Sequence, residues 1–122
     1  MSKCCSCGDS KKNLIYSCSG AANTGYLADN VARKLMKENK GKMTCLSAIG
    51  AELSGFVESA KCVEKNLVID GCPVACGKLI FEKQELPFEH FVLTEFDVEK
   101  GKTEITESVI DEITKKLSTK IG

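Results

Sequence analysis

The segment Leu67-Val68-Ile69-Asp70-Gly71-Cys72-Pro73 contains a strand signal, a turn signal and a helix signal in direct succession. A run of apolar residues without polar alternation predicts a strand that is buried on both faces. Asp-Gly is typical of a turn, and a proline after a turn is typical of the first residue of a helix, where its missing N–H needs no partner. We therefore predict a strand at 67–69 and a helix that runs from Pro73 through Cys76 towards Glu85.

The same alternation of strand and helix signals extends in both directions along the chain. The expected strands are Leu14–Tyr16, Met43–Ile49, Leu67–Ile69 and His90–Thr94, and the expected helices are 24–39, 53–60, 73–85 and 109–117. Helices that connect parallel strands cover both faces of the sheet. We therefore predict an α/β protein: a single three-layer αβα domain with a mainly parallel sheet of four or five strands, Rossmann-like or flavodoxin-like.

Length and composition agree with one domain. The chain has 122 residues, of which 43% are apolar, and this is enough to bury a core without covalent cross-links. The sequence contains no internal repeat, no low-complexity segment and no linker. We expect a cysteine-rich N-terminal arm at residues 1–12 and a single α/β domain at residues 13–122.

The charge pattern argues against two classes of partner. The 17 basic and 17 acidic side chains cancel, and Arg33 is the only arginine, so no basic stripe is available to neutralise phosphates. No stretch approaches the roughly 18 apolar residues that span a membrane. We expect neither specific nucleic-acid binding nor membrane association, and protein partners stay open.

The eight cysteines are far more than a chain of this length ordinarily carries. The opening residues Met1–Gly8 contain no apolar run of an export signal, so we expect the protein in the cytoplasm. In that reducing compartment, clustered thiols are more often metal ligands or reactive groups than disulfides.

Three cysteines follow predicted strands or turns at the edge where an open parallel sheet binds its ligands. Cys18 follows the first strand, Cys72 follows the third, and Cys76 comes one helical turn later on the same face. We expect Cys72 to cap its helix, where the helix dipole favours a thiolate. A free cysteine can also be a small buried apolar residue, and Cys62 fits this description best.

The arm carries Cys4, Cys5 and Cys7 about ten residues before Cys18, close enough to fold back over the same edge. Tetrahedral zinc needs ligands that converge at about 2.3 Å. Closed coordination by four thiolates indicates a structural or storage role, whereas an open fourth position indicates catalysis. We expect one zinc ion per chain, held by Cys18, Cys72, Cys76 and one of Cys4, Cys5 and Cys7.

Two other kinds of site fit the same thiols. In a redox enzyme Cys72 is the nucleophile and Cys76 the resolving thiol, although Cys-x3-Cys is longer than the usual Cys-x2-Cys spacing. His90, the only histidine, is expected at the amino end of its strand, opposite the cysteines, where it cannot serve as their base. Four thiolates also satisfy an iron–sulfur cluster.

Three roles fit Asp70: a hydrogen-bond acceptor at the start of the helix, a partner of a metal ligand, or an acid.

Three motifs together resemble a known family. They are Cys18-Ser19-Gly20, Cys45 with Ala48-Ile49-Gly50, and Asp70-Gly71-Cys72-Pro73 with Cys76. These motifs resemble those of the DGC-domain family, named for its Asp-Gly-Cys motif, whose members are small bacterial and archaeal proteins to which zinc binding is ascribed. The likeness covers about residues 4–117, and the Asp-Gly-Cys-Pro-x-x-Cys element is its most specific part. The resemblance implies a metal site built from Cys18, Cys72 and Cys76, together with an N-terminal cysteine or Cys45.

Overall fold

A four-stranded parallel sheet forms the centre of the computed structural model, which describes residues 13–121. Its strands are β1 (Leu14–Ser17), β2 (Lys42–Met43), β3 (Asn66–Asp70) and β4 (Glu89–Val92), in the spatial order β2-β1-β3-β4. Ile15 lies opposite Leu67 across the β1–β3 pair, and Val68 lies opposite His90 across the β3–β4 pair. All the strand pairs of this sheet are parallel.

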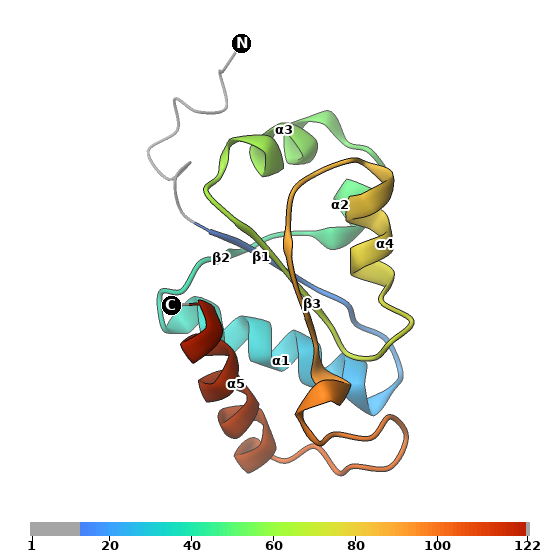
Figure 1. The fold of residues 1–122 in the computed structure, drawn as a ribbon, viewed down its shortest axis with the longest axis vertical. Coiled ribbons are helices and arrows are strands. Elements are labelled where there is room, and N and C mark those ends of the chain that lie inside the picture. The colour runs from blue at the N-terminus through green and yellow to red at the C-terminus, as the bar shows by residue number, and fades with distance from the viewer. Residues whose placement is uncertain (1–12, 122) are drawn as a thin grey trace.

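Helices cover both faces of the sheet. One face carries α1 (Asn23–Lys37) and α5 (Glu107–Ile121), and the other carries α2 (Leu46–Gly50), α3 (Ser54–Cys62) and α4 (Cys76–Lys83). A 3-10 helix, η2 (Leu93–Phe96), follows β4. Figure 1 shows α1 and α5 below the strands and α2, α3 and α4 above them. The prediction of a three-layer α/β fold is confirmed.

Side chains of β3 alternate between two apolar cores. Leu67 and Ile69 pack with α1 and α5, and Val68 packs with Phe81 of α4. Every residue of β3 is buried, which explains its uninterrupted apolar sequence. Burial of an aliphatic side chain of this size stabilises the fold by roughly 1.5–3 kcal/mol.

A buried polar pair links β1 to β3 inside the second core. The Tyr16 hydroxyl donates a hydrogen bond to Asn66 Oδ1 at 3.0 Å, and Asn66 Nδ2 donates to the carbonyls of Ala60 at 2.8 Å and Pro87 at 3.0 Å. Burial raises the pKa of Tyr16 well above its usual range. The neutral hydroxyl is therefore part of the packed core.

The predicted strand at Met43–Ile49 is largely wrong. Only Lys42–Met43 is strand, and Leu46–Gly50 forms helix α2. Leu46 and Ile49, three residues apart, both pack into the core beneath α4, which a helix allows and a strand does not. Cys45 is consequently the exposed N-cap residue of α2 rather than a strand residue.

Two further boundaries differ from the predictions. α4 begins at Cys76 rather than at Pro73, because the chain first makes a turn in which the Ala75 N–H donates to the Cys72 carbonyl at 3.0 Å. Ala75 then adopts a left-handed conformation at φ 54°. The last strand ends at Val92, and η2 occupies the next four residues.

The order β2-β1-β3-β4 places β1 and β3 side by side, and the chain leaves them towards opposite faces of the sheet. β1 leads into α1 on one face, and β3 leads into α4 on the other. The two loops separate at the carboxyl ends of these strands, and ligand sites of open α/β sheets form at such a point.

Candidate functional site

The candidate site lies where the loop after β1 and the turn after β3 diverge. Cys18 is the first residue after β1, and its N–H donates to the Ile69 carbonyl of β3 at 3.1 Å. Residues 71–75 form the turn after β3, which carries Cys72. The predicted placement of Cys18 and Cys72 at the carboxyl edge therefore agrees with the topology.

Gly71 brings the two connections together. Its N–H donates a hydrogen bond to Cys18 Sγ at 3.0 Å. A Cβ at this position would collide with the backbone carbonyl of Thr24 in the first turn of α1. Gly71 does not have a positive φ, so glycine is required here by the close approach of α1 and not by the turn conformation.

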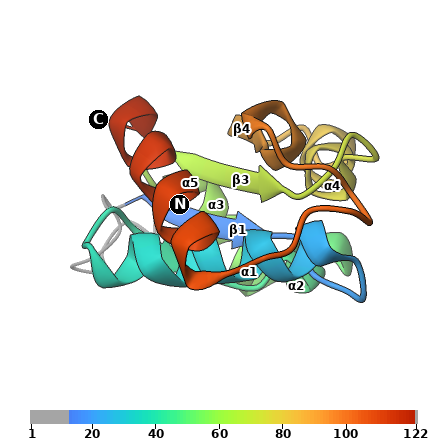
Figure 2. The same cartoon turned by 90° about the horizontal axis from the view of Figure 1, so that it is seen from below.

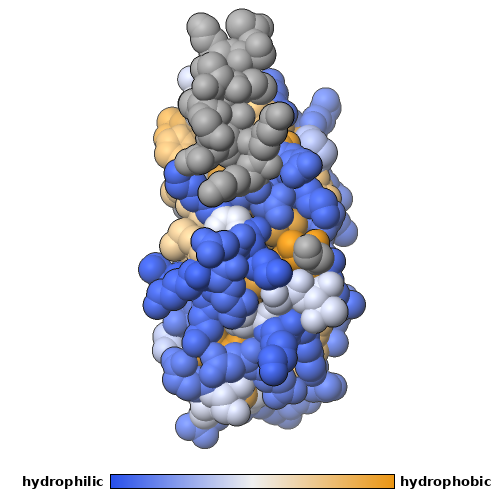
Figure 3. All heavy atoms as spheres, turned by 90° about the vertical axis from the view of Figure 1, so that its left-hand side faces the viewer, coloured by the Kyte–Doolittle hydropathy of each residue, from blue (hydrophilic) through white to orange (hydrophobic). Residues whose placement is uncertain are grey.

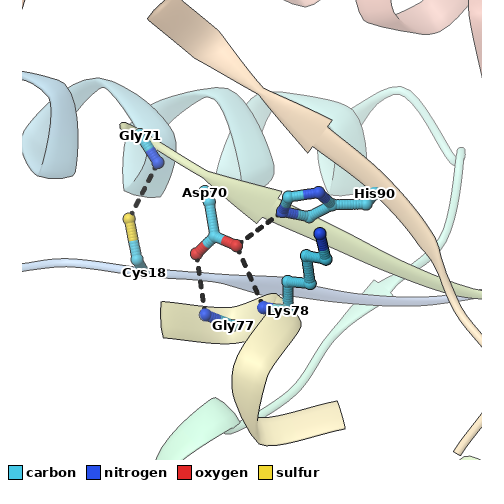
Figure 4. Close-up of polar contacts among 6 residues, drawn as sticks. All are labelled: Cys18, Asp70, Gly71, Gly77, Lys78 and His90. Atoms are coloured by element: carbon cyan, nitrogen blue, oxygen red, sulfur yellow. Dashed lines mark hydrogen bonds and ion pairs between the residues drawn. The ribbon is translucent and has the colours of Figure 1, made fainter. Parts of the chain in front are cut away.

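Asp70 organises the other side of the turn (Figure 4). Its carboxylate accepts hydrogen bonds from the backbone N–H groups of Gly77 at 2.9 Å and Lys78 at 3.1 Å, in the first turn of α4. The side chain is 1% exposed. A Cβ on Gly77 would lie 2.6 Å from Val68 Cγ1, so glycine lets α4 approach this carboxylate. Asp70 thus satisfies the helix start from outside the helix, the role predicted as one of three for it.

His90 completes this network: it lies near the amino end of β4, as predicted, but its side chain reaches Asp70 at the carboxyl end of β3, a contact that was not predicted. Its Nε2 lies 2.7 Å from Asp70 Oδ2, and its ring packs edge-on against Phe88. His90 pairs with Val68 in register, so its side chain is on the same face as Val68 and Asp70. The β3–β4 register therefore places the His90 side chain beside Asp70.

The four cysteines with free thiols in residues 13–121 differ in their surroundings. Cys18 and Cys72 are half-buried, and Cys45 and Cys76 are exposed. Burial raises the pKa of the Cys18 thiol, the Gly71 N–H opposes this, and the negative charges of Asp70, Cys72 and Cys76 raise it further.

Lys100 is a site residue that the sequence analysis missed. Its Nζ lies 3.4 Å from Cys72 Sγ, although 28 residues separate the two. Lys100 belongs to the loop between η2 and α5, and it is one of many lysines scattered among acidic residues. No local signal in the sequence distinguishes it from its neighbour Lys102.

The expected cysteines do not form a preassembled metal site. Within residues 13–121, no group of three or more His, Cys, Asp or Glu side chains is arranged to hold a metal ion. Cys72 is not a helix cap, because α4 starts at Cys76 and its first amides bind Asp70. Cys62 ends α3 and precedes β3, so it lies towards the amino edge; contrary to the expectation of a buried free cysteine, it is half-buried and disulfide-bonded.

The arm cysteines Cys4, Cys5 and Cys7 lie outside the described residues. The chain enters the described structure at Asn13, directly before β1 and therefore at the amino edge of the sheet. A thiolate from the arm has to pass the length of β1 to reach Cys18. The fourth ligand stays a prediction.

Thiols are soft donors that suit zinc and iron–sulfur centres. A thiol beside an ammonium group can also act as a nucleophile. The site therefore supports metal binding once its ligands converge, or thiol chemistry at Cys72 in its present arrangement.

The surface gives no sign of a membrane-spanning element. Among residues 13–121, no helix combines the length and apolar composition needed to cross a bilayer. Figure 3 shows the left-hand side of Figure 1 covered mainly by hydrophilic side chains, with small apolar areas between them.

Comparison with known proteins places the sequence motifs in a wider context. The DGC domain matches residues 14–117 of this chain. The anaerobic and virulence modulator AnvM of Pseudomonas aeruginosa is 32% identical over 88 residues, which make up 71% of this chain and 67% of that protein. No solved structure matches the chain.

Proposed function

This chain belongs to the DGC domain family, and we propose that it is a small cytoplasmic metal-binding protein that holds one zinc ion. The proposed ligands are Cys18, Cys72, Cys76 and one of Cys4, Cys5 and Cys7. Cys18, Cys72 and Cys76 are free thiols, so they are available as metal ligands.

The observation that carries the proposal is the hydrogen bond between the Gly71 N–H and Cys18 Sγ, 3.0 Å long. It ties the cysteine after β1 to the turn that carries Cys72, and Cys76 follows that turn directly. Cys18 and Cys72 thereby lie on two adjoining connections at the point where the sheet topology creates a ligand site, and Cys76 begins the helix that follows. Backbone N–H donation to a ligand sulfur is also a common support for a metal–thiolate centre.

Zinc binding requires two changes from the described arrangement. The three thiols have to converge, because they are not yet arranged to share one ion. The exposed Cys76 and the half-buried Cys72 have room to change rotamer. A fourth thiolate has to arrive from the arm. When bound, zinc in a closed four-thiolate site is structural or stored, whereas an open position makes it a Lewis acid.

Charge compensation at the proposed centre comes from Lys100 and from backbone N–H groups. Four thiolates around a divalent cation leave a formal charge of −2. The start of α4 does not compensate it, because the amides of Gly77 and Lys78 bind Asp70. The Lys100 ammonium, 3.4 Å from Cys72 Sγ, supplies one positive charge.

Metal analysis of protein purified without added metal tests the proposal. We expect about one zinc per chain in the wild-type protein, as one tetrahedral thiolate site predicts. The Cys72→Ser, Cys76→Ser double variant should lose it while keeping its helical content, because the sheet and both helix layers are built from other residues. Cys45→Ser tests the alternative fourth ligand that the family resemblance implies: zinc retained in this variant would favour a cysteine of the arm, and zinc lost would favour Cys45, which is a free thiol exposed at the start of α2.

Two results would contradict the zinc site. Full zinc occupancy in the double variant would show that the metal is held elsewhere. Visible absorption at about 400 nm in fresh protein would indicate an iron–sulfur cluster in place of zinc.

Thiol chemistry at Cys72 is the second candidate, and the Lys100 contact favours it. An ammonium group beside a sulfur stabilises negative charge on a nucleophilic thiolate. His90, the only histidine, does not serve as a base for this thiol in the described arrangement, because its Nε2 contacts Asp70. In metal-free protein near pH 7, one cysteine that reacts far faster than the others would favour a nucleophile, and similar slow rates would favour ligands.

Neither nucleic acid nor a membrane is a proposed partner. The zero net charge and the single arginine support this proposal. Salt-sensitive retention of the protein on DNA would contradict it.

A further inference from the structure

The loop between η2 and α5 contains a short segment, residues 99–103, that is fastened to the start of α1. Asn23 Nδ2 donates hydrogen bonds to the carbonyls of Glu99 at 3.1 Å and Thr103 at 2.8 Å. Asn23 Oδ1 accepts one from the Gly101 N–H at 2.7 Å. One side chain therefore binds both ends and the middle of the segment, across 76 to 80 residues of sequence.

The segment also has internal bonds that make it a defined unit. The N–H groups of Lys102 and Thr103 both donate to the Glu99 carbonyl at 3.1 Å. The Glu99 N–H donates to Thr103 Oγ1 at 2.7 Å. Gly101 has φ 82°, a conformation that side chains other than glycine rarely adopt. We call residues 99–103 the strap.

The strap reaches the candidate site through Lys100. The Lys100 ammonium donates to Cys72 Sγ at 3.4 Å, so the strap connects α1 to the turn that follows β3. Figure 2 shows the loop from β4 to α5 passing the same end of the sheet as the turns that follow β1 and β3. Cys72, which contacts Lys100 of the strap, is half-buried. Cys76 makes no such contact with the described residues of the strap, and it is exposed.

We propose that the strap covers Cys72 and controls access to its sulfur, and that Asn23 is the latch that keeps it closed. With the latch intact, Lys100 stays against Cys72 and the side of the turn that faces the strap is shielded. When the three Asn23 hydrogen bonds are lost, the strap opens more often and Cys72 reacts as an exposed thiol. The zinc readout below rests on the proposed function, but the thiol-labelling readout does not.

The test measures labelling of each cysteine in reduced, metal-free protein by N-ethylmaleimide, quantified by peptide mass spectrometry. The ratio of the Cys72 rate to the Cys76 rate is an internal measure of shielding, because both thiols meet the same reagent in the same sample. Asn23→Ala removes all three latch bonds. Asn30→Ala is the matched control on the same helix, since Asn30 Nδ2 donates only to the Tyr26 carbonyl of its own helix at 2.8 Å.

We expect Asn23→Ala to raise the Cys72/Cys76 ratio by about fivefold or more, because exposed hydrogen bonds of this kind hold a loop with modest free energy. Asn30→Ala should leave the ratio within about twofold of wild type, since its bond does not touch the strap. Backbone amides at residues 97–105 should exchange faster with deuterium in Asn23→Ala only. An unchanged ratio in Asn23→Ala would overturn the proposal.

A second variant keeps the test valid if Asn23→Ala disturbs α1. Thr103→Val removes the bond from the Glu99 N–H while leaving Asn23 in place, and it should also raise the ratio. Far-UV circular dichroism of each variant checks that the helices remain. In zinc-loaded protein, the opened strap should speed zinc transfer to a chelator. A raised labelling ratio in protein that never holds zinc would support the strap and contradict the zinc site.

Discussion

His90 Nε2 lies 2.7 Å from Asp70 Oδ2, and this contact joins β4 to the start of α4 through one buried carboxylate. Asp70 also accepts the Gly77 and Lys78 N–H groups, so its two oxygens hold three donors from two elements. The Asp-Gly-Cys motif thus combines a residue that stabilises the fold with a residue of the candidate site. The aspartate positions α4, and the cysteine faces the candidate site.

Asp70→Asn should destabilise the fold by about 2–3 kcal/mol, because a neutral amide replaces a carboxylate that accepts charge-assisted hydrogen bonds in a buried place. Denaturant unfolding measures the change. Asp29→Asn is the control, since the Asp29 carboxylate forms an exposed pair with Arg33 in α1. Equal stability of Asp70→Asn and wild type would show that the network contributes nothing to the fold.

Gly71→Ala should destabilise the protein by roughly 1–3 kcal/mol, because the added Cβ meets the backbone of Thr24 and forces α1 away from the turn. The same variant should weaken the contact between the residue 71 N–H and Cys18. Gly55→Ala in α3 is the control, since a Cβ there meets nothing within 4 Å and alanine favours a helix. Thermal unfolding of both variants measures the difference. A thermal unfolding midpoint of Gly71→Ala equal to that of wild type would contradict the close packing of Gly71 against Thr24.

Tyr16 should make folding stability sensitive to alkaline pH. Burial raises its pKa in the folded state, so the folded protein holds the phenolic proton more tightly than the unfolded chain. The contribution of the protonated Tyr16 hydroxyl to the free energy of unfolding is fully present below about pH 10, the ordinary tyrosine pKa. This contribution is lost as the pH rises towards the pKa of Tyr16 in the folded protein.

Tyr16→Phe should therefore lose less stability than wild type between neutral pH and pH values above about 10. Tyr26→Phe is the control, because Tyr26 is 55% exposed. Because the chain has two tyrosines and no tryptophan, absorbance at about 295 nm follows each phenolate in the variant that retains it. Ionisation of Tyr16 in fully folded protein near its ordinary pKa would contradict the prediction.

Lys100→Met should weaken zinc retention by about two- to tenfold, because it removes a positive charge that lies against Cys72 Sγ at an exposed position. Competition with a chelator measures the change. Lys102→Met is the control two residues along the same strap. Equal loss in both variants would show that overall charge, and not the contact with Cys72, controls retention.

The sequence was sufficient for the architecture. Apolar runs at 14–16 and 67–69 and helical stripes at 24–39 and 109–117 correspond to β1, β3, α1 and α5. These elements bury side chains on a continuous face, so the spacing of their apolar residues indicates directly which face is buried. The short elements were less predictable. Residues 43–49 form an apolar run that is too short for its periodicity to distinguish a two-residue strand followed by one helical turn from a longer strand.

The sequence pattern was also sufficient to place Cys18 and Cys72 at one edge, because Cys18 directly follows β1, Cys72 follows β3 after one residue, and parallel strands end together. Other features of the site depend on distances between remote segments. His90 meets Asp70 because of the β3–β4 register, Gly71 is required by the approach of Thr24, and Lys100 reaches Cys72 because Asn23 fastens the strap. Local sequence records which face of an element is buried, but contacts between loops depend on how the packed elements bring their ends together.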